Sequence, residues 1–245
     1  LPGYGPTLRF ANVLQLGHNM SVDLYLDKTV AKAKLVVVRL LGGVGYWPYG
    51  AEQLNILCRQ QGIHLAILPG DDQPDPELTE TSTLPIQSCH RLWQYFVQGG
   101  PVNAENFLSY SASLLGDMGD WQEPVQLVRA GLYWPGEAEP TLDHVRSHWQ
   151  AQGPVAPIVF YRALLQADDV KPIDALVGAL MARGVNPLPI FVSSLKDTFS
   201  AGIIAQVFAE THPAVILNCT GFAISTPGKA NVATPFRESD CPVLQ

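Results

Sequence analysis

The sequence predicts an α/β protein built as two three-layer halves, each with a mainly parallel sheet and flanking helices. Residues 35–40, LVVVRL, are apolar or β-branched in five of six positions, which is typical of a strand buried on both faces. A glycine-rich loop, a helix with an apolar stripe and a second strand over 63–68 follow, and such units build parallel sheets. The same plan of strand, loop, helix and strand returns at 155–192, although the two segments are too different to form a sequence repeat.

Helices are expected on either side of these strands in the first half. Thr7 can cap a short helix that reaches Leu14, and Ser21 can cap a second one that runs to about Ala33. Gly62 is placed to end the helix that follows the glycine loop. The remaining expected elements are an acidic, proline-rich turn at 69–76 and helices at 83–97 and 102–115, separated by Gly99-Gly100-Pro101.

We expect a first α/β domain with added helices over 1–130, a connector over 131–153 and a second α/β domain over 154–245. Periodicity is weakest over 116–153, where one helix is predicted at 142–149. Strands are then expected at 155–161, 186–192 and 215–219, and helices at about 172–183 and 196–210. The second domain stops as another apolar strand begins, so we interpret the chain as a piece of a longer protein.

Composition narrows the classes of function. Charged residues make up 15% of the chain, against roughly 25% in an average domain, so we expect part of the surface to be covered by another molecule. The net charge of −7 argues against a nucleic-acid partner. No apolar run is long enough to span a membrane, and four scattered cysteines indicate a reduced, cytoplasmic protein.

The glycine loop is the first candidate site. Its spacing, Gly42-Gly43-x-Gly45, differs from a dinucleotide-binding fingerprint, and the aromatic residues after it would obstruct a pyrophosphate. Tyr46, Trp47 and Tyr49 suit a flat apolar ligand or a protein partner better, because aromatic faces give a large contact area at little entropic cost. Packing of the loop against its own domain remains an alternative.

Tyr161 and Arg162 form the second candidate site. They end a predicted buried strand, and open parallel sheets bind ligands outside the carboxyl ends of their strands. Arg162 could hold a carboxylate there, and Arg39 could do so at the end of the first strand. A structural role for the pair remains an alternative.

Other polar residues have simpler explanations. His144 and His148 could face one metal from a helix, but the sequence places no third ligand at a telling distance, so no metal site is predicted. Cys89 and His90 are adjacent, and neighbouring helical side chains diverge. The acids of 71–77 lack the pattern of a calcium loop, and Ser193 and Ser194 are interpreted as part of a helix cap.

Four strings in the sequence resemble the large subunit of cobaltochelatase, which is also similar to the large subunit of magnesium chelatase. They are SVDLYLDKTVAKAKL, VVVRLLGGVGYWPYGAEQL, LPGDDQPDPEL and PIVFYRALLQADDVKPIDALVGALMARGVNPLPIFVSSLKD. The resemblance covers nearly all of the chain, is weakest across 116–153, and corresponds to the N-terminal region of much longer subunits.

The resemblance implies part of an ATP-dependent ligase that forms nitrogen–metal bonds in cobalamin biosynthesis. The large subunit would bind a corrin-type tetrapyrrole, hydrogenobyrinic acid a,c-diamide, and receive cobalt(II) as a substrate. Two AAA+ type subunits would bind ATP-Mg, which agrees with the lack of a P-loop here, and the fragment alone would be inactive. No catalytic residue of the family can be placed on this chain.

Two hypotheses remain open at this point. In the first, the chain contributes to tetrapyrrole binding through Arg39, Gly43, Gly45, Trp47, Tyr49, Tyr161 and Arg162. In the second, it is a non-catalytic scaffold that docks the AAA+ subunits or the remainder of the large subunit. A magnesium–protoporphyrin counterpart is a further alternative, because the two kinds of large subunit share an architecture.

Overall fold

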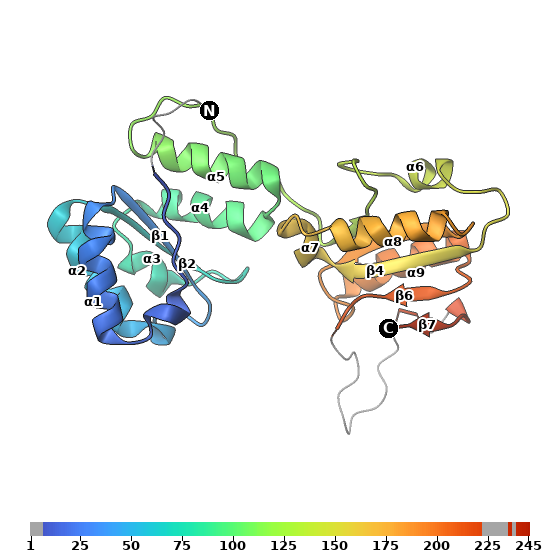
Figure 1. Ribbon diagram of the computed structural model, residues 1–245, viewed down its shortest axis with the longest axis horizontal. Helices are drawn as coiled ribbons and strands as arrows, with labels where there is room; N and C mark the ends of the chain where they lie inside the picture. Colours follow the sequence, from blue (N-terminus) through green and yellow to red (C-terminus); the bar gives the residue numbers. More distant parts are fainter. Residues whose placement is uncertain (1–6, 222–234, 237–238) are drawn as a thin grey trace, which may run out of the picture. The chain divides into compact units, whose positions relative to one another are not determined.

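Residues 7–221, 235–236 and 239–245 are described by a computed structural model, in which the chain forms two compact units that divide after Gln126 (Figure 1). Each unit is α/β with parallel strand pairing, so the predicted fold class is confirmed. The first unit contains, with η for a 3-10 helix, η1 (Val13–Leu16), α1 (Asn19–Lys28), η2 (Val30–Lys32), β1 (Leu35–Leu40), η3 (Val44–Tyr46), α2 (Pro48–Gln61), β2 (His64–Pro69), α3 (Pro76–Thr81), α4 (Ile86–Gln98) and α5 (Pro101–Ser113).

The first unit is a two-stranded parallel sheet between two layers of helices. Val36 and Val38 of β1 face the core formed with α1 and α2, whereas Leu35 and Val37 face the core formed with α4 and α5. Figure 1 shows these two helix pairs on different sides of the strands. The alternation follows from the two-residue period of a strand and explains why both faces of LVVVRL are apolar.

β1 is half-buried, whereas β2 is almost completely buried. The outer edge of β2 is closed by the segment before α4: Ser82 Oγ accepts from Ile67 N at 2.8 Å and Thr83 Oγ1 accepts from Leu65 N at 2.7 Å. These hydroxyls satisfy peptide groups that a neighbouring strand would otherwise bond.

Two helix predictions near the N-terminus need correction. Residues 7–12 contain no helix, and the first turn is η1, capped by the side chain of Asn12. The reason is that Leu8 and Phe10 stay exposed, and so short a helix needs a packed face to be stable. α1 begins before Ser21 and ends at Lys28, where Thr29 leaves helical geometry.

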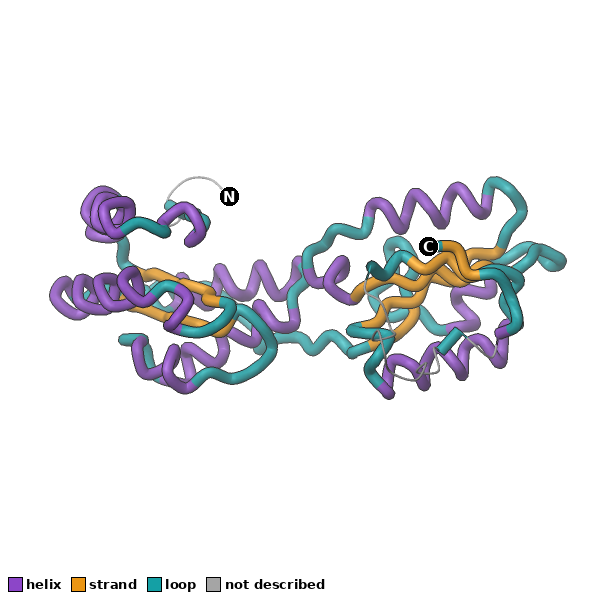
Figure 2. The backbone as a smooth tube through the Cα atoms, turned by 90° about the horizontal axis from the view of Figure 1, so that it is seen from below, coloured by secondary structure: helices purple, strands orange, loops and turns teal. Residues whose placement is uncertain are grey.

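The second unit contains a five-stranded sheet in the order β3-β5-β4-β6-β7, in which β3 is antiparallel and the other pairs are parallel. Figure 2 shows helices on both sides of these strands. Its elements are β3 (Ala130–Leu132), α6 (Leu142–Ser147), β4 (Val155–Tyr161), α7 (Arg162–Gln166), α8 (Lys171–Met181), β5 (Asn186–Val192), α9 (Thr198–Thr211), β6 (Ile216–Asn218) and β7 (Val243–Leu244). The predicted loop at 162–169 is partly helical, because α7 begins directly after β4.

Residues 131–153, expected to connect two domains, lie within the second unit. β3 pairs with β5 from Ala130 opposite Val192 to Leu132 opposite Ile190. Tyr133, Trp134 and Val145 are buried in the same core as β4 and β5. The segment is irregular in sequence because it supplies one short strand and isolated core residues rather than a long periodic element.

Candidate functional site

The carboxyl end of β1 is shaped by close approaches of the backbone. Gly42 and Gly43 have φ values of 95° and 77°, which side chains rarely adopt. A Cβ on Gly70 would lie 2.6 Å from the backbone nitrogen of Leu41, and one on Gly43 would lie 3.1 Å from Asp75 Oδ2. The two strand ends and the N-terminus of α3 therefore meet without intervening side chains.

Arg39 lies at this end of the sheet. Its NH2 group donates to the carbonyl of Gly70 at 2.8 Å, and its guanidinium carbon lies 4.8 Å from the centre of the Phe96 ring. Partial burial lowers the pKa of Arg39, and the nearby charge of Asp71 opposes this shift. The side chain thus bridges β1, the end of β2 and α4, and it is exposed enough to meet a ligand.

Two of the three loop aromatics are held by their own unit. Trp47 is 8% exposed and its Nε1 donates to the carbonyl of Leu16 at 2.9 Å. Tyr49 donates from its hydroxyl to Asp23 at 2.8 Å, and this hydrogen bond raises the pKa of Tyr49. Tyr46 is 57% exposed, so it is the loop aromatic that faces solvent. A Cβ on Gly45 would meet no atom within 4 Å, so this residue leaves open space beside the loop.

Tyr161 and Arg162 lie at the carboxyl end of β4, as expected. Arg162 donates from Nε to the carbonyl of Val128 at 3.0 Å and from NH2 to that of Leu127 at 2.7 Å. These bonds tie the chain before β3 to the start of α7. Arg162 therefore has a structural role, and a carboxylate would have to compete with two backbone carbonyls for it.

β4 lies between β5 and β6. The chain forms β5 on one side of β4 and then crosses over to form β6 on the other side, so the strand order reverses at β4. Such a switch point forms a crevice outside the carboxyl ends of parallel strands. Beside Tyr161, the turn after β6 is ordered by Asn218, whose Oδ1 accepts from the backbone nitrogen and hydroxyl of Thr220. The glycine loop and Arg39 belong to the first unit, whereas the carboxyl end of β4 belongs to the second.

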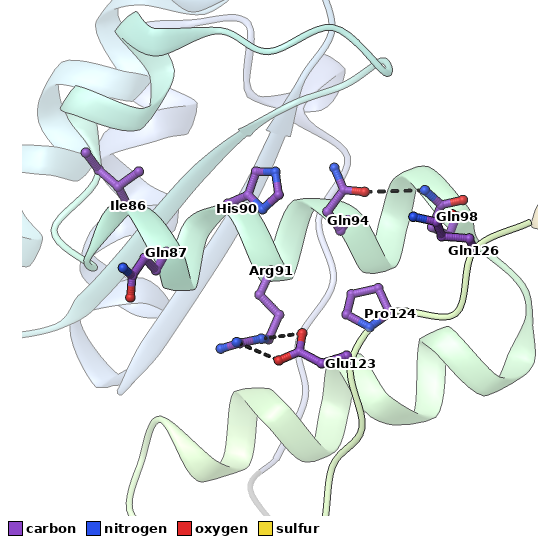
Figure 3. A pocket seen from close by; sticks show the side chains of 9 residues that line it. All are labelled: Ile86, Gln87, His90, Arg91, Gln94, Gln98, Glu123, Pro124 and Gln126. Carbon is purple, nitrogen blue, oxygen red and sulfur yellow. Dashed lines mark hydrogen bonds and ion pairs between the residues drawn. The ribbon is translucent and has the colours of Figure 1, made fainter.

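An open groove of about 550 Å³ runs along α4, where the sequence predicts no site (Figure 3). The lining includes two apolar residues, Ile86 and Pro124. Its polar residues are Gln87, His90, Arg91, Gln94, Gln98, Glu123 and Gln126. Glutamines at 87, 94 and 98 recur with helical spacing on one face of α4, and that pattern is the signal that could have revealed it.

The other polar candidates have structural roles. His148 Nδ1 lies 3.0 Å from the carbonyl of His144, and its ring lies 4.6 Å from that of Trp134. Asp197 caps α9 by accepting from the nitrogen and hydroxyl of Ser200, which lowers the pKa of Asp197. Over the described ranges, no three His, Cys, Asp or Glu side chains gather closely enough to hold a metal ion.

None of the helices in the described part of the chain has the length and apolar character that crossing a membrane requires.

A family model described as CobN/Magnesium Chelatase matches residues 93–245. The match covers more than half of the chain, so the chain belongs to this family, and the predicted resemblance is confirmed. The chain is 42% identical to the aerobic cobaltochelatase subunit CobN of Sinorhizobium sp. over 98% of its length. It is 44% identical to the protein of that name from Pseudomonas aeruginosa over 100% of its length. The chain spans 20% of each of these relatives.

More distant matches agree with this assignment. Over 82% of the chain, identity to the H-type subunit of magnesium chelatase from Rhodobacter capsulatus is 23%. A solved structure described as the catalytic subunit of cobaltochelatase from Mycobacterium tuberculosis superposes with a TM-score of 0.59 at 23% identity. It covers 80% of this chain and 15% of that one, and the likeness shows a shared fold.

Proposed function

We propose that this chain is part of the substrate-binding large subunit of an ATP-dependent cobaltochelatase. The observation that carries the proposal is the identity of 42–44% to two aerobic cobaltochelatase subunits along nearly the whole chain. Identity to the magnesium-chelatase subunit is 23%, which favours cobalt over magnesium. The complex would act in the cytoplasm and insert cobalt(II) into hydrogenobyrinic acid a,c-diamide during cobalamin biosynthesis, with ATP-Mg bound by AAA+ partner subunits.

Within this proposal, each unit offers its own candidate contacts for the tetrapyrrole, at the carboxyl end of a strand. In the first unit these are Arg39, Gly43 and Gly45 after β1, and in the second unit they are Tyr161 and Arg162 at the end of β4. Trp47 and Tyr49 would act by holding the glycine loop, because both are bonded to their own unit. Tyr46, which is exposed beside the positive-φ glycines, would offer the aromatic face.

The proposal is tested by titrating the 245-residue chain with hydrogenobyrinic acid a,c-diamide, followed by absorbance and tryptophan fluorescence. Protoporphyrin is the control ligand, and each titration is repeated with cobalt(II). We expect saturable binding of the corrinoid and weaker binding of the porphyrin. Equal or tighter binding of protoporphyrin would favour the magnesium counterpart, and no binding of either ring would remove the substrate site from this chain.

A docking module is the second candidate function. Large apolar side chains over residues 8–24 are exposed in the first unit, among them Phe10 at 90%, Met20 at 74% and Leu14 at 67%. Such a density of exposed apolar residues is typical of a surface that another polypeptide covers. We expect the chain to co-elute with AAA+ partner subunits, and Phe10→Asp to abolish this; a strictly monomeric chain that binds neither partner would contradict the docking function.

A further inference from the structure

We propose that the outer edge of β1 pairs with a further strand, which is supplied by a part of the large subunit outside these 245 residues. This inference rests on the proposed function, in which the chain is part of that larger subunit. Within the described ranges, the sheet of the first unit contains β1 and β2 alone, so β1 has a neighbouring strand on one side only. Parallel sheets with helices on both faces usually contain more strands than two.

The pairing of β1 with β2 shows which peptide groups of β1 point outward. The carbonyl of Lys34 accepts from His64 N at 3.0 Å, and every second residue after Lys34 faces β2 in the same way. The N–H and C=O groups of Leu35, Val37 and Arg39 therefore face away from β2. In the part of the chain that the structure describes, no hydrogen bond reaches these outward groups. Such a row of peptide groups is a template for another strand.

The two edges of this sheet differ in their protection. The outer edge of β2 is closed by the hydroxyls of Ser82 and Thr83. Over residues 35–38, β1 has neither a charged residue nor a proline, the usual devices that keep an exposed edge from pairing. The guanidinium of Arg39, the one charged group of this strand, donates to the carbonyl of Gly70. The edge of β1 is therefore suited to pairing, whereas that of β2 is not.

The added strand has to be apolar on both of its faces. Val36 and Val38 belong to the core formed with α1 and α2, and Leu35 and Val37 to the core formed with α4 and α5. All four are only half-buried, whereas the β2 residues opposite 36–38 are 0% exposed. A third strand, at the usual spacing of about 4.8 Å, would cover the side chains of β1 on both faces.

A strand of this kind is expected to belong to the same polypeptide. On a free partner, a strand that is apolar on both faces would promote aggregation, so it has to fold together with the sheet that it joins. The chain spans 20% of each of the two cobaltochelatase relatives, so most of those polypeptides lies outside the matched region and can supply a strand. A covalent link also raises the effective concentration of that strand, to about the millimolar range for short linkers.

Hydrogen exchange in β1 tests the pairing. It is measured by mass spectrometry with residue-level fragmentation in the 245-residue chain and in the complete large subunit. The outward amides of Leu35, Val37 and Arg39 should exchange rapidly in the chain and at least about tenfold more slowly in the subunit, because a hydrogen-bonded amide exchanges only when it opens. The amides of Val36 and Val38 bond β2 in both proteins and are the internal reference.

Two variants of Val37 connect the exchange rates to the outward peptide group. Val37→Pro removes an N–H that faces outward and no bond to β2, and edge strands tolerate proline at such positions. We expect the chain to keep its fold, as thermal unfolding would show, and the complete subunit to lose the slow exchange at Leu35 and Arg39. Val37→Thr keeps the N–H and the branched shape, so this matched control should leave exchange in the subunit unchanged.

Equally fast exchange of the outward amides in the chain and in the complete subunit would overturn this inference. Slow exchange in the chain with formation of a dimer would assign the edge to a second copy, and slow exchange only after addition of the AAA+ subunits would assign it to them; both results would also overturn it. Binding of hydrogenobyrinic acid a,c-diamide to the same subunit is measured separately. Slow exchange in a subunit that binds no corrinoid would support the pairing and contradict the proposed function.

Discussion

Trp47 lies so close to the first turn of α2 that residue 50 has to be glycine. A Cβ on Gly50 would lie 1.9 Å from the indole ring, well inside any real contact distance. We expect Gly50→Ala to displace Trp47 and to lower the free energy of unfolding by about 1–3 kcal/mol, the usual cost of overpacking. Chemical denaturation followed by tryptophan fluorescence measures this effect.

Gly45→Ala is the matched control for that variant, since a Cβ there meets no atom within 4 Å. Gly45 lies in η3 and Gly50 in the first turn of α2, and each change adds one methyl group. If the two variants were equally stable, the indole would not be packed against α2 as described.

Cys58 is fully buried in the core beneath α2, and burial raises the pKa of its thiol to about 11. In an unfolded chain the same thiol titrates near a pKa of about 8.5. Between these values the unfolded state releases a proton that the folded state keeps, so the free energy of unfolding falls as the pH rises. Urea denaturation at about pH 8 and at about pH 10 measures how much the free energy of unfolding falls between these two pH values, and this fall should be smaller for Cys58→Ala than for the unmodified chain. An identical fall in both proteins would mean that this thiol ionises freely in the fold.

At the scale of elements, the segment 122–125 depends on one buried side chain of α5. Asn103 is 3% exposed and satisfies both peptide groups of Val125. Asn103→Ala would leave these groups without protein partners, which costs about 1–3 kcal/mol. We expect lower stability and faster hydrogen exchange at the amide of Val125.

Asn106→Ala provides the comparison for Asn103. Asn106 bonds the nitrogen of Gln122 from a more exposed position, where water can replace the lost acceptor. Its loss should cost less than that of Asn103. Equal costs would show that burial does not set the strength of this attachment.

The sequence predicts long buried elements well and isolated contributions poorly. β1, β4 and β5 match their predicted ranges because each is a mainly apolar run of six or seven residues. β3 has only three residues, and its place is determined by pairing with a strand about 60 residues later, which no local pattern encodes. Tyr133 and Trp134 therefore fall in a predicted connector, although they lie in a core.

In the candidate site, too, the sequence predicts local features and misses contacts between distant residues. The sequence places Arg39, the glycine loop, Tyr161 and Arg162 at strand ends, because strand boundaries and glycines are local signals. It does not reveal that Trp47 bonds Leu16 or that Arg162 bonds Leu127 and Val128, since these partners are distant in sequence. Which aromatic of a loop faces solvent is decided by such tertiary contacts.

At the scale of the whole molecule, separate cores indicate that each unit can fold alone. One buried cluster lies in the second unit and two flank the sheet of the first unit. The low charge content of the chain then reflects exposed apolar residues, such as Phe10 and Met118, rather than an unusually large single core. Each unit can therefore fold whether or not another molecule covers these exposed apolar side chains.

The start of the second unit can be tested with two fragments. We expect residues 127–245 to fold by themselves and residues 154–245 to remain unfolded. The shorter fragment removes β3 from the edge of β5 and takes Tyr133, Trp134 and Val145 out of the core. Losing three large buried side chains at about 1.5–3 kcal/mol each removes most of the stability of a typical domain.

Two-dimensional amide NMR spectra measure the outcome directly. The longer fragment should give dispersed peaks that superimpose on those of the full chain, whereas the shorter fragment should give the narrow dispersion of an unfolded polypeptide. Native-like peaks from residues 154–245 would show that 131–153 is a connector after all, because the sheet would then be stable without β3. The comparison thus decides whether the short, aperiodic segment is part of the fold or only spans it.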